Sequence, residues 1–166
     1  MRSRLLTDGP VRTYAVVFDP GDEPLSGLVA FSRDHRIDAA HLTAIGAVSH
    51  ATVGWFDLER RDYRRIELDE QLEVLSLVGD VTGPAPGGSD PIVHVHAVLG
   101  RHDGSAVGGH LLVASVRPTL EVLLTETPAE LARRHDEATG LALIDIDAST
   151  APAGTKPGGT HGTNRR

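Results

Sequence analysis

Between residues 47 and 126, the sequence consists of short apolar runs rich in Val, Leu, Ile and Thr. Gly, Pro and Asp separate the runs, and this pattern is typical of β-strands joined by turns. A succession of strands with few helices predicts an α+β domain around a central antiparallel β-sheet. The strands predicted in this region are 47–58, 63–68, 72–81, 92–100, 110–117 and 119–126.

The segments outside this region predict further strands and three short helices that flank the sheet. The helices are expected at 23–36, 37–47 and 128–138, and the additional strands at 11–19 and 141–146. Pro24 suits the first turn of the first helix. In the second helix, Asp38 could cap the beginning and Gly46 could end it.

The 166 residues are enough for one domain with its own core, and we predict that this domain spans residues 1–147. Residues 148–166 are rich in Pro, Gly and Thr and contain almost no apolar side chain, which predicts a disordered C-terminal tail. Aromatic residues make up only 4% of the chain. The core must therefore consist of small aliphatic side chains, and further burial between subunits is expected.

Charge and cysteine content exclude several classes of protein. The chain has no cysteine, so disulfides and thiolate metal sites are absent. Residues 1–150 carry 13 cations and 23 acids, a balance of −10, which disfavours direct binding to a nucleic acid backbone. The N-terminal residues form no long apolar run and no cleavage-site pattern. We therefore predict a cytoplasmic protein without a membrane segment.

Three histidines stand in apolar, β-prone runs between residues 91 and 116. His94 and His96 are two residues apart on one predicted strand, so their side chains project from the same face. His110 is on the next predicted strand. Whether it joins the other two depends on the turn between the strands.

The sequence "RHDGS" indicates that turn. A three-residue loop over 102–104 would place Gly104 in the left-handed conformation that such loops favour. This loop would pair Arg101 with Ser105, so the two residue numbers of every cross-strand pair would sum to 206. His110 would then lie directly opposite His96. His94 would lie on the same face, and the three imidazoles would converge.

Two alternatives would separate His110 from the others. A two-residue Asp-Gly turn would shift the pairing by one residue and move His110 to the opposite face. A β-bulge at Gly108 and Gly109 would have the same effect. The histidines could also be half-exposed side chains that bond to backbone carbonyls without any metal.

Three converging neutral imidazoles form the ligand set of an open zinc site, with a fourth position left for water or a substrate. Nitrogen ligands also accept nickel, iron or copper, and the spacing does not distinguish among these ions. Glu121, on a predicted apolar strand, could orient a ligand histidine or act as a general base beside a metal-bound water. It could equally face solvent on an edge strand.

Several segments together resemble the plant-and-prokaryote conserved (PPC) domain. The matching stretches are "GLVAFSRDHRIDAAHLTAIGAVSHATVGWFD", "QLEVLSLVGDV" and "VHVHAVLGRHDGSAVGGHLLVASVRPTLEVLL". The resemblance implies a central antiparallel sheet flanked by helices and assembly as a homotrimer. The histidines match the family's histidine motif, and residues 72–75 resemble the segment that plant members use to contact other proteins. The Arg-Gly-Arg-Pro AT-hook of plant members does not occur in this sequence.

The sequence thus predicts a small homotrimer that binds a divalent metal, with zinc the first candidate, through His94, His96 and His110. No nucleophile or phosphate-binding loop indicates a reaction, so enzymatic activity stays open. The alternative hypothesis is a regulatory module associated with DNA, acting directly or through protein partners. In its direct form, this alternative would use the four arginines within 58–65. A purely structural trimer is the third possibility.

Overall fold

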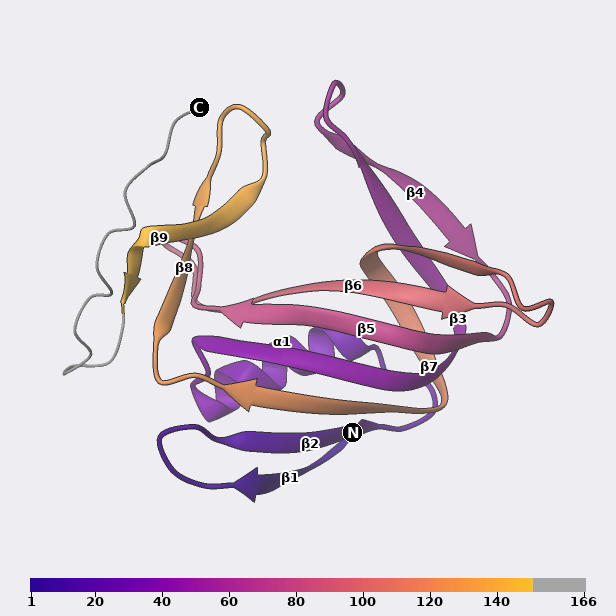
Figure 1. The fold of residues 1–166 in the computed structure, drawn as a ribbon, viewed down its shortest axis with the longest axis horizontal. Coiled ribbons are helices and arrows are strands. Elements are labelled where there is room, and N and C mark those ends of the chain that lie inside the picture. Colours follow the sequence, from indigo (N-terminus) through magenta and orange to yellow (C-terminus); the bar gives the residue numbers. More distant parts are fainter. Residues whose placement is uncertain (151–166) are drawn as a thin grey trace, which may run out of the picture.

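The computed structural model describes residues 1–150 of the protein. Figure 1 shows a large antiparallel sheet, one helix against it and a separate two-stranded hairpin at its end. The elements are β1 (Arg2–Thr7), β2 (Thr13–Phe18), α1 (Pro24–His35), β3 (Ala39–Asp57), β4 (Asp62–Leu68), β5 (Leu72–Thr82), β6 (Ile92–Gly100), β7 (Ala106–Glu126), β8 (Glu130–His135) and β9 (Ala142–Thr150).

The large sheet has seven strands in the order β1-β2-β7-β6-β5-β3-β4, and every pairing is antiparallel. An additional pairing joins β3 to β7. Because β3, β5, β6 and β7 each pair with two others of the four, their ladders close into a ring. The two longest strands, β3 and β7, hold this ring together and also carry β4 and β2 at their outer ends.

Helix α1 begins where the sequence predicts. The carboxylate of Glu23 accepts hydrogen bonds from the backbone N–H groups of Leu25 and Ser26, which caps the helix, and Pro24 occupies the first turn. The buried side chains of Leu28 and Phe31 pack into the apolar core with the inward-facing residues of the sheet. Within residues 1–150, no helix is both long and apolar enough to cross a bilayer.

The predicted helix over 37–47 is wrong, because these residues form the first half of β3. Burial alternates along the segment: Ala40 and Leu42 face the core, whereas His41 and Thr43 face outward. This period of two belongs to a strand. Gly46 does not end a helix but lies at a register shift, with φ +150° and a backbone so close to Thr119 that a Cβ would meet its carbonyl oxygen at 2.3 Å.

The predicted helix over 128–138 is also wrong. Its middle forms strand β8, which pairs with β9 in the separate hairpin. The described residues therefore contain one helix rather than the expected three, and the sheet is flanked on one side only. The predicted strand 141–146 is confirmed as part of β9. The predicted tail of 148–166 falls in two parts: residues 148–150 form the end of β9, and residues 151–166 lie outside the described part of the chain.

Two features of the sheet were not predicted. The runs 110–117 and 119–126 belong to one continuous strand, β7, which pairs with β3 over most of its length. Residues 2–7 add an exposed edge strand beside β2. Both features extend the predicted antiparallel sheet without changing its class.

Candidate metal centre

The β6–β7 hairpin has the predicted three-residue loop. The backbone N–H of Arg101 donates to the carbonyl of Ser105 at 2.8 Å, and that of Gly104 donates to the carbonyl of Arg101 at 3.0 Å. Gly104 has φ +83°, the left-handed conformation that the loop requires. His96 pairs directly with His110, and the pairing of 96–100 with 106–110 contains no bulge. The predicted register is therefore confirmed.

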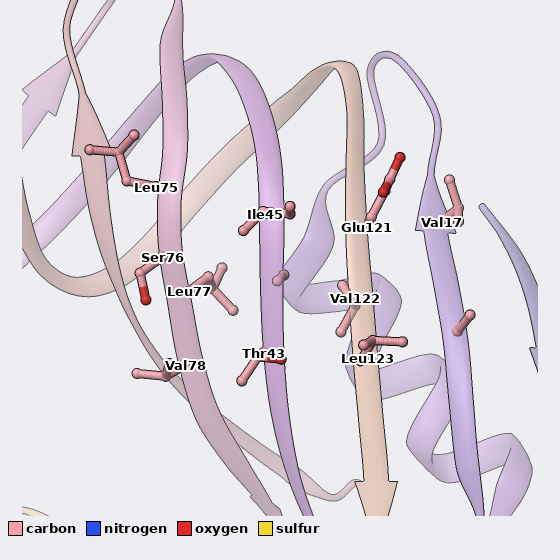
Figure 2. Close-up of a pocket in the computed structure, with 12 residues that line it drawn as sticks. Val17, Thr43, Ile45, Leu75, Ser76, Leu77, Val78, Glu121, Val122 and Leu123 are labelled. Carbon is pink, nitrogen blue, oxygen red and sulfur yellow. The ribbon is translucent and has the colours of Figure 1, made fainter. Parts of the chain in front are cut away.

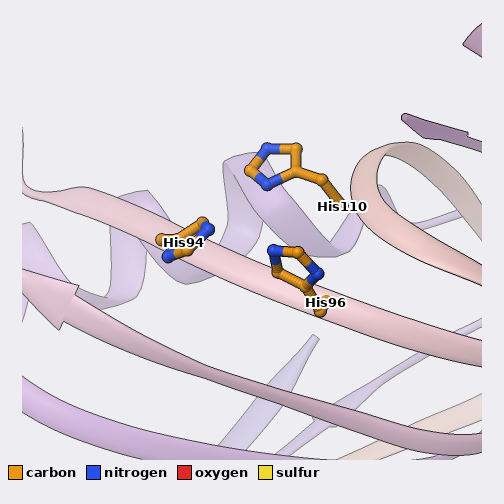
Figure 3. Close-up of side chains that lie close together, drawn as sticks. All are labelled: His94, His96 and His110. Carbon is orange, nitrogen blue, oxygen red and sulfur yellow. The ribbon is translucent and has the colours of Figure 1, made fainter. Parts of the chain in front are cut away.

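The three histidines lie on the outer face of the sheet. Val95 and Ala97 face the core, so the alternating side chains of His94 and His96 point away from it. Figure 3 shows the three rings gathered over β6, with His110 reaching across from β7. The site is thus a surface cluster on a rigid hairpin and not a set of core histidines.

The ring geometry brings one nitrogen from each histidine into a common space. The ring centroids of His94 lie 5.1 Å from those of both His96 and His110, and the last two are 5.4 Å apart. One ring nitrogen of each residue lies within 4.8 Å of the others. Nitrogens bound to one zinc at about 2.0–2.1 Å in tetrahedral geometry are roughly 3.4 Å apart. Small rotations of the three rings would bring their nitrogens to this separation.

The electrostatics of the cluster favour neutral imidazoles. Burial, together with the neighbouring His94, His96 and Arg133, lowers the pKa of His110 to about 4, and burial is the largest cause. Burial and the proximity of His94 also lower the pKa of His96. Neutral imidazole is the form that binds metal, so these two residues keep their ligand form at neutral pH.

The ring of His110 is buried on its Nδ1 side and packs against an aromatic side chain. Its Nδ1 is buried and has no hydrogen-bond partner among the described residues. Tyr63 stacks on the same ring, with centroids 4.9 Å apart and planes at 25°. The tyrosine can reach it because Gly54, the pairing partner of His110, has no side chain; a Cβ there would meet Tyr63 at 2.6 Å. The ring is therefore held in place while one nitrogen has no partner.

Asp80 and Arg133 lie beside His94. Asp80 is the pairing partner of His94 on β5, and its Oδ2 lies 3.5 Å from the histidine Nδ1. Arg133, from β8, donates to Oδ1 of Asp80 at 2.6 Å. Burial alone would raise the pKa of Asp80, but the contacts with His94 and Arg133 outweigh it and keep this pKa below its ordinary value. Asp80 is thus an ionised carboxylate at the edge of the cluster.

Glu121 does not join the histidines. It lies on the second half of β7, exposed, opposite Val17 and Ile45. Figure 2 shows it at the rim of a shallow apolar groove of about 440 Å³ on the outer face, lined also by Leu75 and Leu123. The structure therefore gives no support for Glu121 as a base or as a partner of a ligand histidine.

The sequence reasoning did not identify Tyr63, Asp80 and Arg133 as part of the site. Asp80 could have been found from the register of β5 with β6, but the connection over 83–91 is too long for a single turn type to set this register. Arg133 was placed on a helix that does not exist, so its reach to Asp80 could not be seen. Tyr63 depends on the pairing of β4 with β3, which brings it over Gly54.

We expect the metal-free protein to lose stability as the pH falls from about 6.5 to about 4. In this window the unfolded chain protonates His110, whereas the folded protein keeps it neutral, so protons favour unfolding. The stabilising contribution is complete above the ordinary pKa of 6.5 and is lost as the pH falls through the folded pKa of about 4. Urea unfolding across this range measures the slope. The variant His110→Gln, which cannot titrate, should show a flatter one; equal slopes would contradict the assignment.

Comparison with known proteins gives a consistent picture. The family model of the Plants and Prokaryotes Conserved (PCC) domain matches residues 6–128. No curated protein matches the chain. Among solved structures, a metal-containing protein from Archaeoglobus fulgidus is 34% identical, with a TM-score of 0.73; the match covers 87% of this chain and 98% of that one.

Two further solved structures are similar. A plant- and prokaryote-conserved protein from Pyrococcus horikoshii is 32% identical, with a TM-score of 0.74, over 81% of this chain and 91% of that one. A protein from Ralstonia eutropha, named "putative DNA-binding protein", is 27% identical, with a TM-score of 0.72, over 80% of this chain and 90% of that one. The matched region contains all three histidines, whereas Arg133 lies beyond residue 128.

Proposed function

Because the chain belongs to the Plants and Prokaryotes Conserved (PCC) domain family, we propose that it binds a divalent metal ion, zinc in the first instance, through His94, His96 and His110. The observation that carries this proposal is the convergence of three ring nitrogens within 4.8 Å on one face of a hairpin. The buried Nδ1 of His110, which has no partner among the described residues, supports it. So does the similarity to the protein from Archaeoglobus fulgidus, which is described as metal-containing.

The donor set fits zinc and related ions. Three neutral imidazoles without a carboxylate or thiolate ligand are the chemistry of an open site, in which the protein supplies three ligands. When bound, such an ion polarises a bound oxygen atom or lowers the pKa of a bound water. The chain's own residues hold the rings in place: Tyr63 stacks on His110, and Asp80 lies beside His94. No residue in the cluster is a candidate nucleophile, so we assign no reaction.

Metal analysis of protein purified without a histidine tag tests the proposal. We expect about one metal ion per chain by mass spectrometry, because residues 1–150 of each chain hold one three-histidine set. After removal of the ion with a chelator, added zinc should raise the melting temperature, since binding to the folded state alone stabilises it. Absence of stoichiometric metal together with an unchanged melting temperature would refute the proposal.

We further propose that the chain assembles as a homotrimer through the outer face of the sheet. Ile45, Leu75 and Leu123 are exposed by 62%, 56% and 53%, and they surround the groove of Figure 2. An apolar patch on three neighbouring strands normally marks an interaction surface. The family resemblance supplies the expected number of subunits, and the scarcity of aromatic core residues agrees with burial between copies.

The variant Ile45→Lys should convert the trimer to a smaller species. A lysine at the centre of the apolar face would have to be buried without a partner in the assembly, and buried unpaired charge is strongly unfavourable. Light scattering coupled to gel filtration measures the mass. Leu6→Lys is the matched control, because Leu6 is 53% exposed on the edge strand β1, away from the groove. A wild-type protein with the mass of one chain would contradict the proposal.

DNA association is the alternative function and receives less support from this chain. Acids interrupt the basic character of the β3–β4 hairpin: Glu59 precedes its four arginines and Asp62 divides them into two pairs. Arg60 lies 3.9 Å from Asp57. Residues 1–150 carry ten more acids than cations. If the alternative is correct, duplex binding should weaken with salt and with neutralisation of Arg60, Arg61, Arg64 and Arg65.

A further inference from the structure

His94 differs from the other two histidines in having charged neighbours on its Nδ1 side. Oδ2 of Asp80 lies 3.5 Å from this nitrogen, and Nη2 of Arg133 lies 3.3 Å from it. Because Nδ1 faces these two groups, Nε2 is the nitrogen of His94 that is available to a metal. The neighbours of Nδ1 therefore decide whether Nε2 carries a proton or a free electron pair.

The two neighbours favour opposite tautomers. A guanidinium can only donate a hydrogen bond, so a bond from Arg133 requires an unprotonated Nδ1 and places the proton on Nε2. An ionised carboxylate can only accept, so a bond to Asp80 requires Nδ1–H and leaves Nε2 free. Only the second arrangement permits a metal bond through Nε2.

The position of the Asp80 carboxylate is fixed from two sides. Its backbone lies in β5, where it pairs with His94. Its Oδ1 accepts a 2.6 Å bond from Arg133, whose side chain is only 7% exposed. Arg133 is itself anchored, since its Nη1 donates to the carbonyl of Ala142 at 2.8 Å. The carboxylate is thus held against His94 by the β8–β9 hairpin, which lies outside the part of the chain that matches the family domain.

We propose that Asp80 is a positioning residue of the metal site: it accepts the Nδ1–H of His94, selects the tautomer with a free Nε2 and fixes the plane of the ring. Arg133 holds the Asp80 carboxylate in place, so the C-terminal hairpin contributes to the site without supplying a ligand. This inference rests on the proposed metal-binding function. In the metal-bound protein, the bond from Arg133 to Nδ1 gives way to the bond from Nδ1 to Asp80, while Arg133 keeps its bond to Oδ1.

Zinc titration of the chelator-treated protein tests the role of Asp80. Asp80→Ala should weaken zinc affinity by about 10- to 100-fold, the usual effect of removing a partner of a ligand histidine. Asp80→Asn should recover part of the loss, because its amide oxygen can still accept from Nδ1–H but carries no charge. The matched control is Glu73→Ala, which removes an exposed acid from the same strand and should change the affinity less than about twofold.

A second measurement separates positioning from a general effect on folding. In the zinc-loaded protein, the Nδ1–H proton of His94 should give a proton resonance that moves in Asp80→Asn, whereas the ring resonances of His96 and His110 should stay in place. A purely structural role for Asp80 would shift all three or none. This measurement uses Asp80→Asn, whose side chain is nearly isosteric with that of Asp. It therefore tests the role of Asp80 even if Asp80→Ala fails to fold.

The outcomes distinguish the two proposals. If the wild type binds no zinc, the proposed function fails and this inference fails with it. If the wild type binds zinc and Asp80→Ala binds it as tightly as Glu73→Ala does, the metal site stands and the role of Asp80 is refuted. The role of Asp80 is supported if zinc affinity falls from the wild type to Asp80→Asn and falls further in Asp80→Ala, and if only the Nδ1–H resonance of His94 moves.

Discussion

Replacing His110 by Ala is expected to lower zinc affinity by about two to three orders of magnitude. Zinc sites with four ligands have apparent binding free energies of about 10–16 kcal/mol, so one ligand corresponds to roughly 2.5–4 kcal/mol. His110 supplies one of the three ring nitrogens, and no other histidine or acid of the described residues shares their common space. Competition with a chromophoric chelator measures the affinity.

The control for this experiment is His102→Ala. His102 belongs to the same hairpin, but it lies in the loop with its side chain 88% exposed and should have no effect on zinc binding. His110→Ala also relieves the burial of an unpartnered nitrogen, so the metal-free variant should not be less stable on that account. Equal affinities for the two variants would show that zinc binds elsewhere.

Replacing Arg133 by Met is expected to destabilise the β8–β9 hairpin by about 2–4 kcal/mol. The change keeps the aliphatic stem but removes the bonds to Asp80 and to the carbonyl of Ala142. It also leaves the half-buried Asp80 without its cation. Hydrogen exchange of the β8 amides measures the loss directly, because this hairpin can open without unfolding the large sheet.

Arg134→Met is the matched control. Arg134 is the next residue on the same strand, 76% exposed, and pairs with Asp145 at 3.0 Å. The Asp145 side chain is only 10% exposed, but it keeps hydrogen bonds from the backbone N–H groups of Asp147 and Ala148 when the exposed Arg134 is lost, so the exchange rates of β8 should change little. Similar acceleration in both variants would mean that Arg133 is not the anchor of the hairpin.

The sequence predicted those parts of the site that depend on local rules. The loop over 102–104 has a defined geometry that Gly104 makes possible, and this geometry alone sets the pairing of His96 with His110. The strands of the second half were predicted because their apolar runs are bounded by turn residues. The agreement extends to the start of α1, where Pro24 lies in the first helical turn as predicted.

The errors arose where distant contacts determine the local structure. Residues 37–47 contain Ala and Leu at spacings that suit a helix, but pairing with both β5 and β7 makes them a strand. The same holds for β8, which is stabilised by its pairing with β9. Propensity is a weak guide in such segments because tertiary pairing overrides it. The partnership of Asp80 and Arg133 joins two such distant strands and was out of reach for the same reason.

The ring of strand pairings has a consequence for the way an ion would enter the site. His96 is flanked by Val78 on β5 and by His110 on β7, so the backbone at His96 is bonded along both edges, and the backbone at His94 is bonded along its β5 edge. The main chain around the ligands therefore loses its conformational entropy during folding, before any ion binds. Binding of the ion then has to restrict only the side-chain rotations of the three imidazoles. We therefore expect the ion to bind to a site that is already formed, and not to drive folding of the hairpin. Hydrogen exchange of the β6 amides should change little when the ion binds.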